Sequence, residues 1–144
     1  MSSPDAIARA IERAIEKAGP TMAANFTHPA WVMSAEEFVA FWGGTRLASV
    51  ATVGKSGWPH AAPVEVTLAG DRFLVPAFPN SVRMADLRRS PRLVVTTWDD
   101  AWHAAIVYGL AELVGASGGS ITVRPTRIYA IRAPQGHHAS RRAG

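Results

Sequence analysis

The chain has 144 residues, 48% of them hydrophobic and 18% charged, which excludes a disordered, collagen-like or coiled-coil chain and predicts one globular domain. It has no cysteine, so disulfides and thiolate metal sites are excluded, and no apolar run is long enough to span a membrane. The net charge of +4 is divided unevenly, with −1 in residues 1–80 and +5 in residues 81–144, and this distribution points to an anionic partner in the second half.

Residues 1–33 are expected to form a helix followed by an irregular connector. Ser3 can cap the helix, Pro4 suits its first position, and Gly19-Pro20 ends it. Its thin apolar stripe, which suggests docking on a surface such as a second subunit, is formed by Ile7, Ile11 and Ile15. Charges occur throughout and no apolar signal core is present, so we expect a cytoplasmic location.

A second helix is expected from Ser34 to Gly43-Gly44, because Ser34 and Glu37 have the spacing of a capping box. Beyond it, β-branched and aromatic runs alternate with turn residues, which is typical of an antiparallel sheet or barrel. The expected strands are 46–53, 58–68, 72–78, 92–98, 102–114 and 121–132. The predicted fold is mainly β, a six-stranded antiparallel barrel domain over 34–133 with N-terminal helices and a flexible tail over 134–144.

Self-sufficient catalytic motifs are missing from the sequence. Gly54-Lys55-Ser56 resembles the end of a phosphate-binding loop, but position 49 is Ser and strands flank the motif, so it is expected to be a hairpin turn. There is no nucleophile elbow and no paired-histidine zinc helix. His60 and His103 lie on different expected strands without a third ligand, so we expect no metal site.

Residues 79–92 give one chemical signal. Asn80 or Ser81 can cap a short helix, and Arg83 then falls in its first turn, where unpaired N–H groups already create positive potential. No acidic residue precedes Asp86 in this helix. A capped helix start with a first-turn arginine favours a bound phosphate, and the alternative is an exposed arginine on a surface helix.

Residues 58–64 give the second signal. Pro59 and Pro63 cannot donate ladder hydrogen bonds, so the strand must lie at an edge or be bulged there. The small residues between the prolines leave the backbone accessible to a flat polar ring. The alternative is an edge strand that uses proline only to prevent aggregation.

These two stretches, in this order, resemble those of the flavin-binding split-barrel proteins related to pyridoxamine 5'-phosphate oxidase. The resemblance runs from Ser34 to Arg132, about two thirds of the chain. The matching segments are SAEEFVAFW, RLASVATVGKSGWPHAAPV, RFLVPAF, SVRMADLRRSPRLVV and YGLAELV. Each segment alone matches the family pattern only loosely, but their succession is characteristic. The resemblance implies a six-stranded split β-barrel.

The resemblance also implies a homodimer that binds FMN, or the deazaflavin F420 in a sister branch, in a groove at the subunit interface. By position, Ser81 and Arg83 would hold the cofactor phosphate, with Val82 between them. The ring and ribityl chain would be lined by His60, Ala61, Ala62, Pro63, Val64, Ala77 and Phe78. The groove would be completed from the partner subunit by Trp98, Trp102 and Tyr108.

Two departures from the family pattern bear on the site. Val82 and Ala85 stand where many relatives carry a basic residue, so the phosphate site has less positive charge. The last two strands are joined only by GASGGS, where relatives often insert a helix that shapes the substrate pocket.

The function that the resemblance implies is an FMN-dependent oxidoreductase acting on an unknown small molecule. The cofactor would carry the hydride chemistry, so the absence of a catalytic triad is consistent with this reading. The alternatives are an F420-dependent reductase and a non-catalytic flavin or haem carrier or sensor. An oligonucleotide-binding barrel is disfavoured, because the arginines gather at one helix and the tail rather than along a strand face; we expect no nucleic-acid or membrane partner.

Overall fold

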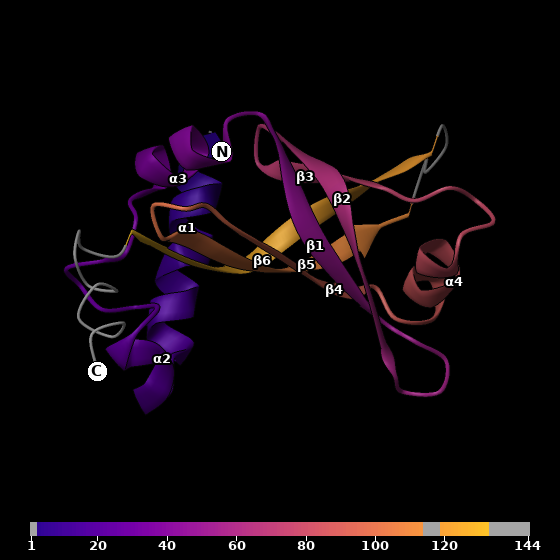
Figure 1. Ribbon diagram of the computed structural model, residues 1–144, viewed down its shortest axis with the longest axis horizontal. Helices are drawn as coiled ribbons and strands as arrows, with labels where there is room; N and C mark the ends of the chain where they lie inside the picture. The colour runs from indigo at the N-terminus through magenta and orange to yellow at the C-terminus, as the bar shows by residue number, and fades with distance from the viewer. Residues whose placement is uncertain (1–2, 114–118, 133–144) are drawn as a thin grey trace.

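Six antiparallel strands close into a barrel in the computed structural model, which describes residues 3–113 and 119–132 (Figure 1). The strands are β1 (Thr45–Val53), β2 (Pro59–Ala69), β3 (Arg72–Pro76), β4 (Arg92–Trp98), β5 (His103–Glu112) and β6 (Ser120–Arg132). Their order around the barrel is β1-β2-β3-β6-β5-β4, and pairing of β1 with β4 closes it. The predicted mainly β fold with a six-stranded antiparallel barrel is confirmed.

The turns follow from glycine and proline chemistry. Gly57 in the β1–β2 turn and Gly70 in the β2–β3 turn adopt φ values of 89° and 66°, in the left-handed region that favours glycine. The third strand ends at Pro76, two residues earlier than expected, although the N–H of Ala77 still donates to the carbonyl of Gly119. The N–H of Ser81 donates to the carbonyl of Phe78 (2.9 Å), which turns the chain into the next helix.

Helix α3 (Ala35–Trp42) packs its aromatic residues into the barrel core. Trp42 is buried, lies edge-on to Phe73 with ring centroids 4.9 Å apart, and donates its indole N–H to the carbonyl of Val66 (3.0 Å). The predicted capping box of Ser34 and Glu37 is present. The helix therefore begins where the sequence indicates and fixes the end of the barrel at which β1 starts.

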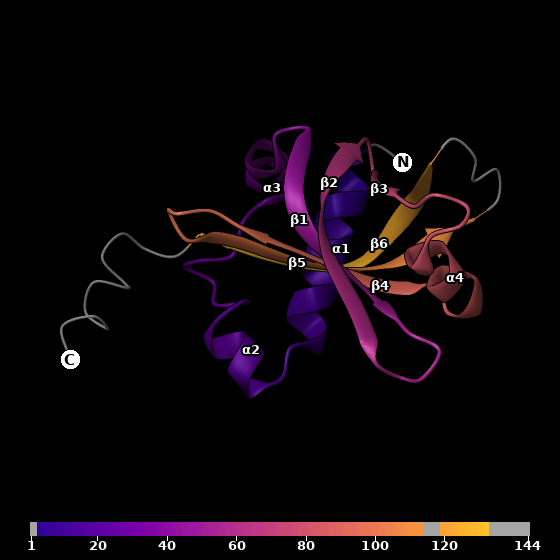
Figure 2. The ribbon, with the colours of Figure 1, turned by 45° about the vertical axis from the view of Figure 1, so that its right-hand side comes forward.

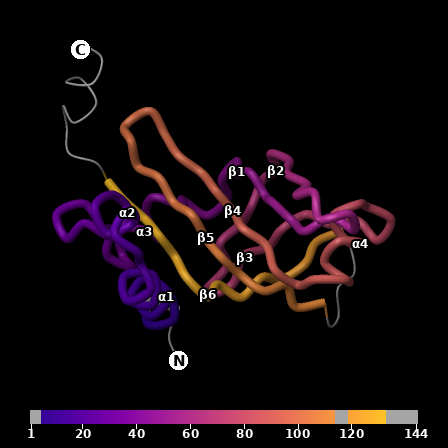
Figure 3. The backbone as a smooth tube through the Cα atoms, turned by 90° about the horizontal axis from the view of Figure 1, so that it is seen from below, coloured from indigo at the N-terminus to yellow at the C-terminus, as the bar shows by residue number. Residues whose placement is uncertain are grey.

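Helix α1 (Ser3–Lys17) packs against β6 (Figures 2 and 3), so the first and last elements of the fold are neighbours. The Nε of Arg13 donates to the carbonyl of Thr126 (2.7 Å). The buried face of the helix consists of Ile7, Ala10, Ile11 and Ala14. The stripe therefore docks on a surface, as expected: the chain's own barrel covers Ile7 and Ile11, Ile15 remains exposed, and a contact with a second subunit stays a prediction.

The connector after α1 contains a short helix, α2 (Pro20–Ala24), which corrects the expectation of a wholly irregular segment. Gly19 is extended at its start and Pro20 occupies the first turn, where proline loses no hydrogen bond. The Gly-Pro pair therefore ends one helix and also begins another. The expected tail over 134–144 lies outside the described residues. Within residues 3–113 and 119–132, no helix has the length and apolar character needed to cross a membrane.

Candidate functional site

Helix α4 (Val82–Arg89) lies at one end of the barrel, between β3 and β4 (Figure 1). Ser81 is its N-cap: the Ser81 Oγ accepts from the N–H of Met84 (3.1 Å) and donates to the carbonyl of Phe78 (2.7 Å). Met84 and Leu87 are buried as the i, i+3 spacing predicts. The predicted short helix with a serine cap is therefore present.

Arg83 is a half-buried cation in the first turn of α4. Its guanidinium donates to the carbonyl of Pro76 (2.6 Å), which fixes the side chain beside the helix N-terminus. Burial lowers the pKa of Arg83, and the first turn contains no acidic residue. Among the described residues no carboxylate forms an ion pair with Arg83. A desolvated cation beside unpaired helix N–H groups is the arrangement that binds an anion.

β2 has one free edge near this helix. It pairs with β1 along most of its length, but with β3 only over Thr67–Ala69. Between Pro59 and Val66 no described strand pairs with its other edge. The predicted edge strand is confirmed, and both prolines lie in the unpaired stretch.

The free edge offers backbone donors and acceptors. The carbonyl of Trp58 accepts from the N–H of Gly54 (3.0 Å), so the even-numbered residues of β2 direct their backbone groups toward β1. The odd-numbered residues direct theirs away from β1, and Ala61 presents both an N–H and a C=O on that side. The missing N–H groups of Pro59 and Pro63 also fall on that side, so neither proline breaks the β1–β2 ladder.

A buried carboxylate connects α4 to the β1–β2 hairpin. Asp86 is 1% exposed, and its Oδ2 lies 2.6 Å from the Nδ1 of His60 on β2 and 2.8 Å from the Oγ1 of Thr52 on β1. Its Oδ1 accepts from Arg89 one turn further along α4 (2.7 Å). Each carboxylate oxygen therefore has a partner, and together the partners come from β1, β2 and α4.

Burial alone would raise the pKa of Asp86, but the other contacts reverse this. Hydrogen bonds from His60 and Thr52, followed by the positive charges of His60 and Arg89, hold the pKa below its usual value of 3.8. The carboxylate is therefore ionised at neutral pH. Half of the His60 side chain remains exposed, so the ring joins a buried charge to the surface.

The sequence singled out His60 but not its partners. Asp86 follows a buried Met84 by two positions, where helical periodicity predicts exposure, and it is buried only because α4 rests on the hairpin. Thr52 lies 34 residues from Asp86 in sequence, and no short motif links them. The spacing of a histidine between two edge prolines was the only local signal for this cluster.

The residues after β3 occupy two environments. Ala77 is buried and its N–H donates to the carbonyl of Gly119 (2.9 Å), so its side chain offers no surface to a ligand. Phe78 is 67% exposed. A Cβ on Gly119 would lie 2.8 Å from the Phe78 ring, so the ring lies directly on that glycine. Of the two positions, only Phe78 can line a groove with its side chain.

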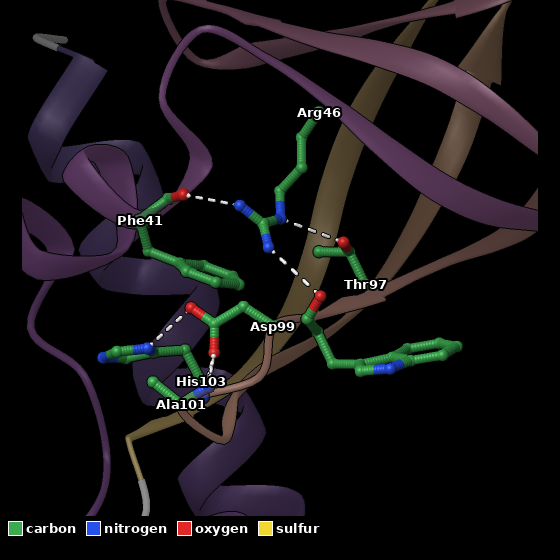
Figure 4. A network of polar contacts seen from close by, with 7 residues as sticks. Phe41, Arg46, Thr97, Asp99, Ala101 and His103 are labelled. Carbon is green, nitrogen blue, oxygen red and sulfur yellow. Dashed lines mark hydrogen bonds and ion pairs between the residues drawn. The ribbon is translucent and has the colours of Figure 1, made fainter.

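Trp98 and Trp102 lie at the other end of the barrel. Arg46 at the start of β1 donates to the carbonyls of Trp98 (3.1 Å) and Phe41 (3.2 Å), as Figure 4 shows for Phe41. Arg46 and Thr52 are six residues apart on β1, about 20 Å. Within one chain these tryptophans therefore do not reach Ser81 and Arg83.

The same end carries a second histidine–aspartate pair (Figure 4). The Nδ1 of His103 lies 2.8 Å from Asp99 Oδ2, and Asp99 Oδ1 accepts from the backbone N–H groups of Ala101 and His103. Burial would raise the pKa of Asp99, but these hydrogen bonds from His103 lower it. Both partners are about a third exposed, and the pair closes the β4–β5 turn.

A groove of about 540 Å³ runs over the outer face of the sheet. It crosses β1, β4, β5 and the middle of β6, and Pro59 forms part of its rim. Tyr108 lines the groove, and the guanidinium of Arg127 lies 4.5 Å above the Tyr108 ring. The groove also includes Arg92, and none of its described lining residues is acidic.

Comparison with known proteins agrees with this architecture. Residues 34–143 match the sequence model of the family described as pyridoxamine 5'-phosphate oxidase. The comparison with curated proteins found no match. A conserved hypothetical protein from Mycobacterium tuberculosis has a TM-score of 0.64 and 18% identity, with 73% of this chain and 88% of that chain covered.

Two further solved structures share the barrel. General Stress Protein 26 from Bacillus anthracis has a TM-score of 0.58 and 19% identity, over 69% of this chain and 94% of that one. A protein named F420 reductase has a TM-score of 0.50 and 16% identity, over 57% of this chain and 87% of that one. At such identities the likeness shows the split-barrel fold alone.

Proposed function

This chain belongs to the pyridoxamine 5'-phosphate oxidase family, and on that premise we propose that it is an FMN-binding oxidoreductase acting on a small molecule. Members of the family include flavin oxidoreductases, F420 reductases and haem-binding proteins. The observation that carries the proposal is the half-buried guanidinium of Arg83 at the N-terminus of α4, in a first turn that contains no acidic residue. Among those ligand classes, flavin nucleotides and F420 present a phosphate to such a site.

The residues present fit a flavin nucleotide. A phosphate at the start of α4 would meet the Arg83 guanidinium and the first N–H groups of the helix. Ser81 can keep its capping role there, and Val82 is exposed beside it. The exposed side chain of Val82 adds no charge, so Arg83 is the main source of affinity for the phosphate.

The free edge of β2 suits the polar rim of the flavin ring. Ala61 offers one N–H and one C=O in the unpaired stretch, and His60, Ala62 and Val64 alternate with it along the strand. FMN, when bound, supplies the hydride chemistry. The chain's own residues bind the phosphate, orient the ring against a fixed strand and leave Phe78 exposed at the rim.

The second copy in the proposed homodimer would complete this site. Trp98, Trp102 and Leu47 are large exposed apolar residues at the end of the barrel remote from α4. Because one chain cannot bring the tryptophans to its own α4, they can serve the site only from a partner, whereas Tyr108 already lines the groove with Thr52 and Pro59 of the same chain. We expect a dimer at micromolar concentration in sedimentation velocity. A monomer with and without FMN would contradict this arrangement.

The decisive experiment measures FMN binding to Arg83→Ala by quenching of flavin fluorescence. Loss of a charge-assisted hydrogen bond of about 1.5–3 kcal/mol predicts FMN affinity about 10- to 150-fold weaker than wild type. Riboflavin, which lacks the phosphate, is expected to bind both proteins nearly equally. Arg88→Ala, which removes an exposed arginine from the last turn of the same helix, is the matched control and is expected to change neither affinity.

Other outcomes separate the alternatives. Equal weakening for FMN and riboflavin would mean that Arg83 shapes the groove by holding the Pro76 carbonyl, and that no phosphate lies there. Tight binding of F420 without FMN would favour the F420-dependent reductase. Binding of haem without either would favour the non-catalytic carrier. The absorbance spectrum of the purified protein, with mass spectrometry of the released ligand, distinguishes these three.

A further inference from the structure

His60 is a surface histidine whose ring is held on two sides. Its Nδ1 is 2.6 Å from the buried Asp86 Oδ2, while half of the side chain stays exposed. On the hairpin side, a Cβ placed on Gly54 would lie 2.9 Å from the Cε1 of His60 and 3.2 Å from its Nδ1. The ring therefore rests against glycine backbone, and Asp86 fixes its orientation.

The carboxylate decides which ring nitrogen carries the proton. An ionised Asp86 can only accept, and it already accepts from Thr52 and Arg89. Nδ1 must therefore be the donor, which leaves Nε2 without a hydrogen in the neutral ring. The charged groups of this cluster are Asp86 and Arg89 of α4, and Thr52 is the β1 residue in contact with Asp86. Lys55 follows Gly54 in the hairpin turn.

We propose that His60 exchanges a proton at Nε2 with the ligand bound along the free edge of β2, and that Asp86 is the positioning residue that fixes its tautomer. This rests on the proposed function. His60 precedes Ala61, whose backbone groups face that edge, so a flat cofactor bound along the edge would lie next to the strand position of His60. The exposed half of the side chain gives the proton a route to solvent.

Asp86→Asn provides a specific spectroscopic signature. Arg89 only donates, so the single oxygen of the new amide must face Arg89. The NH₂ group then faces the Oγ1 of Thr52 and the Nδ1 of His60, both of which can accept. The substitution is therefore expected to invert the tautomer of His60, so that Nε2 carries the hydrogen.

The first measurement uses the apo protein and needs no ligand. Long-range ¹H–¹⁵N spectra of the histidine rings are expected to show His60 with hydrogen on Nδ1 in wild type and on Nε2 in Asp86→Asn. Asp99→Asn, at the other histidine–aspartate pair, is the matched control and should leave His60 unchanged. Hydrogen on Nε2 in wild-type His60 would overturn the proposal whether or not any variant folds.

The second measurement adds FMN, with fluorescence quenching as the independent test of binding. The ¹⁵N chemical shift of the His60 Nε2 is expected to change when FMN binds, while the ring signals of His103 stay unchanged. Quenching without a change at the His60 Nε2 would overturn the proton-exchange role and leave the proposed function standing. Absence of quenching in wild type would overturn the FMN proposal and the proton-exchange role together.

Discussion

The two ends of the barrel each hold a histidine–aspartate pair, but the pairs differ in sequence separation and in the burial of the carboxylate. His103 and Asp99 are four residues apart, both partly exposed, and the carboxylate also accepts two backbone N–H groups of the same turn. His60 and Asp86 are 26 residues apart, and the carboxylate is 1% exposed. The first pair completes a turn, whereas the second joins a helix to a hairpin.

The comparison shows that the same pair of side chains can have a local or a long-range cause. A turn carboxylate that caps N–H groups is satisfied by chain geometry alone. A carboxylate buried between its own helix and a hairpin has lost its solvation, and it is stable only because Thr52, His60 and Arg89 all contact it. The pair with the larger desolvation cost, His60 and Asp86, lies beside the proposed cofactor site. The pair with the smaller cost, His103 and Asp99, lies at the end of the barrel remote from α4.

The largest expected contrast is in stability. Asp86→Ala leaves Thr52 and His60 without their acceptor and is expected to lower the free energy of unfolding by about 3 kcal/mol. Asp99→Ala, which removes a partly exposed carboxylate, is expected to lower it by about 1 kcal/mol. Urea unfolding followed by tryptophan fluorescence measures both. Equal losses would break the distinction between the two ends.

A smaller contrast concerns space around each histidine. A Cβ at Gly54 would lie 2.3 Å from the carbonyl oxygen of Trp58, so Gly54→Ala must displace the hairpin and is expected to cost about 2 kcal/mol. Ala101 lies exposed in the β4–β5 turn, and Ala101→Ser is expected to stay within about 0.5 kcal/mol of wild type. Thermal unfolding monitored by circular dichroism compares the two, and a tolerated Gly54→Ala would show that the ring of His60 is not held as described.

The smallest expected effect is on acid stability. The pKa of Asp86 and that of Asp99 both lie below the usual value in the folded chain, so each carboxylate contributes stability that is complete above that value and lost as pH falls through the folded pKa. Asp86→Asn and Asp99→Asn are each expected to flatten the loss of stability between about pH 5 and about pH 3. Urea midpoints across that range provide the measurement, and an unchanged slope in either variant would contradict a lowered pKa there.

Much of the fold could be predicted because its signals are local. The capping residues Ser34 and Ser81, the turn at Gly57 and the two prolines of β2 each act within a few residues, and each has the expected role. The short helix after Gly19-Pro20 was missed because the pair that ends α1 also suits the start of another helix.

The site was harder to predict because its contacts span the chain. Arg83 was singled out as a phosphate ligand, but its bond to the Pro76 carbonyl depends on how β3 ends. Asp86 gave no sequence signal, since helical spacing from Met84 predicts exposure whereas the structure buries it. Helix α1 shows the same division: its apolar stripe predicts that it packs on a surface, while only the fold shows that this surface is β6.

The packing of α1 on β6 has a consequence for how the chain reaches its native state. Ile7, Ala10 and Ile11 become buried only when a strand made more than 100 residues later is in place, as the Arg13–Thr126 bond spanning 113 positions illustrates. During synthesis the apolar face of the helix therefore stays exposed to water until nearly the whole barrel has left the ribosome. Long loop closures of this kind slow folding, so α1 is expected to be among the last elements to dock.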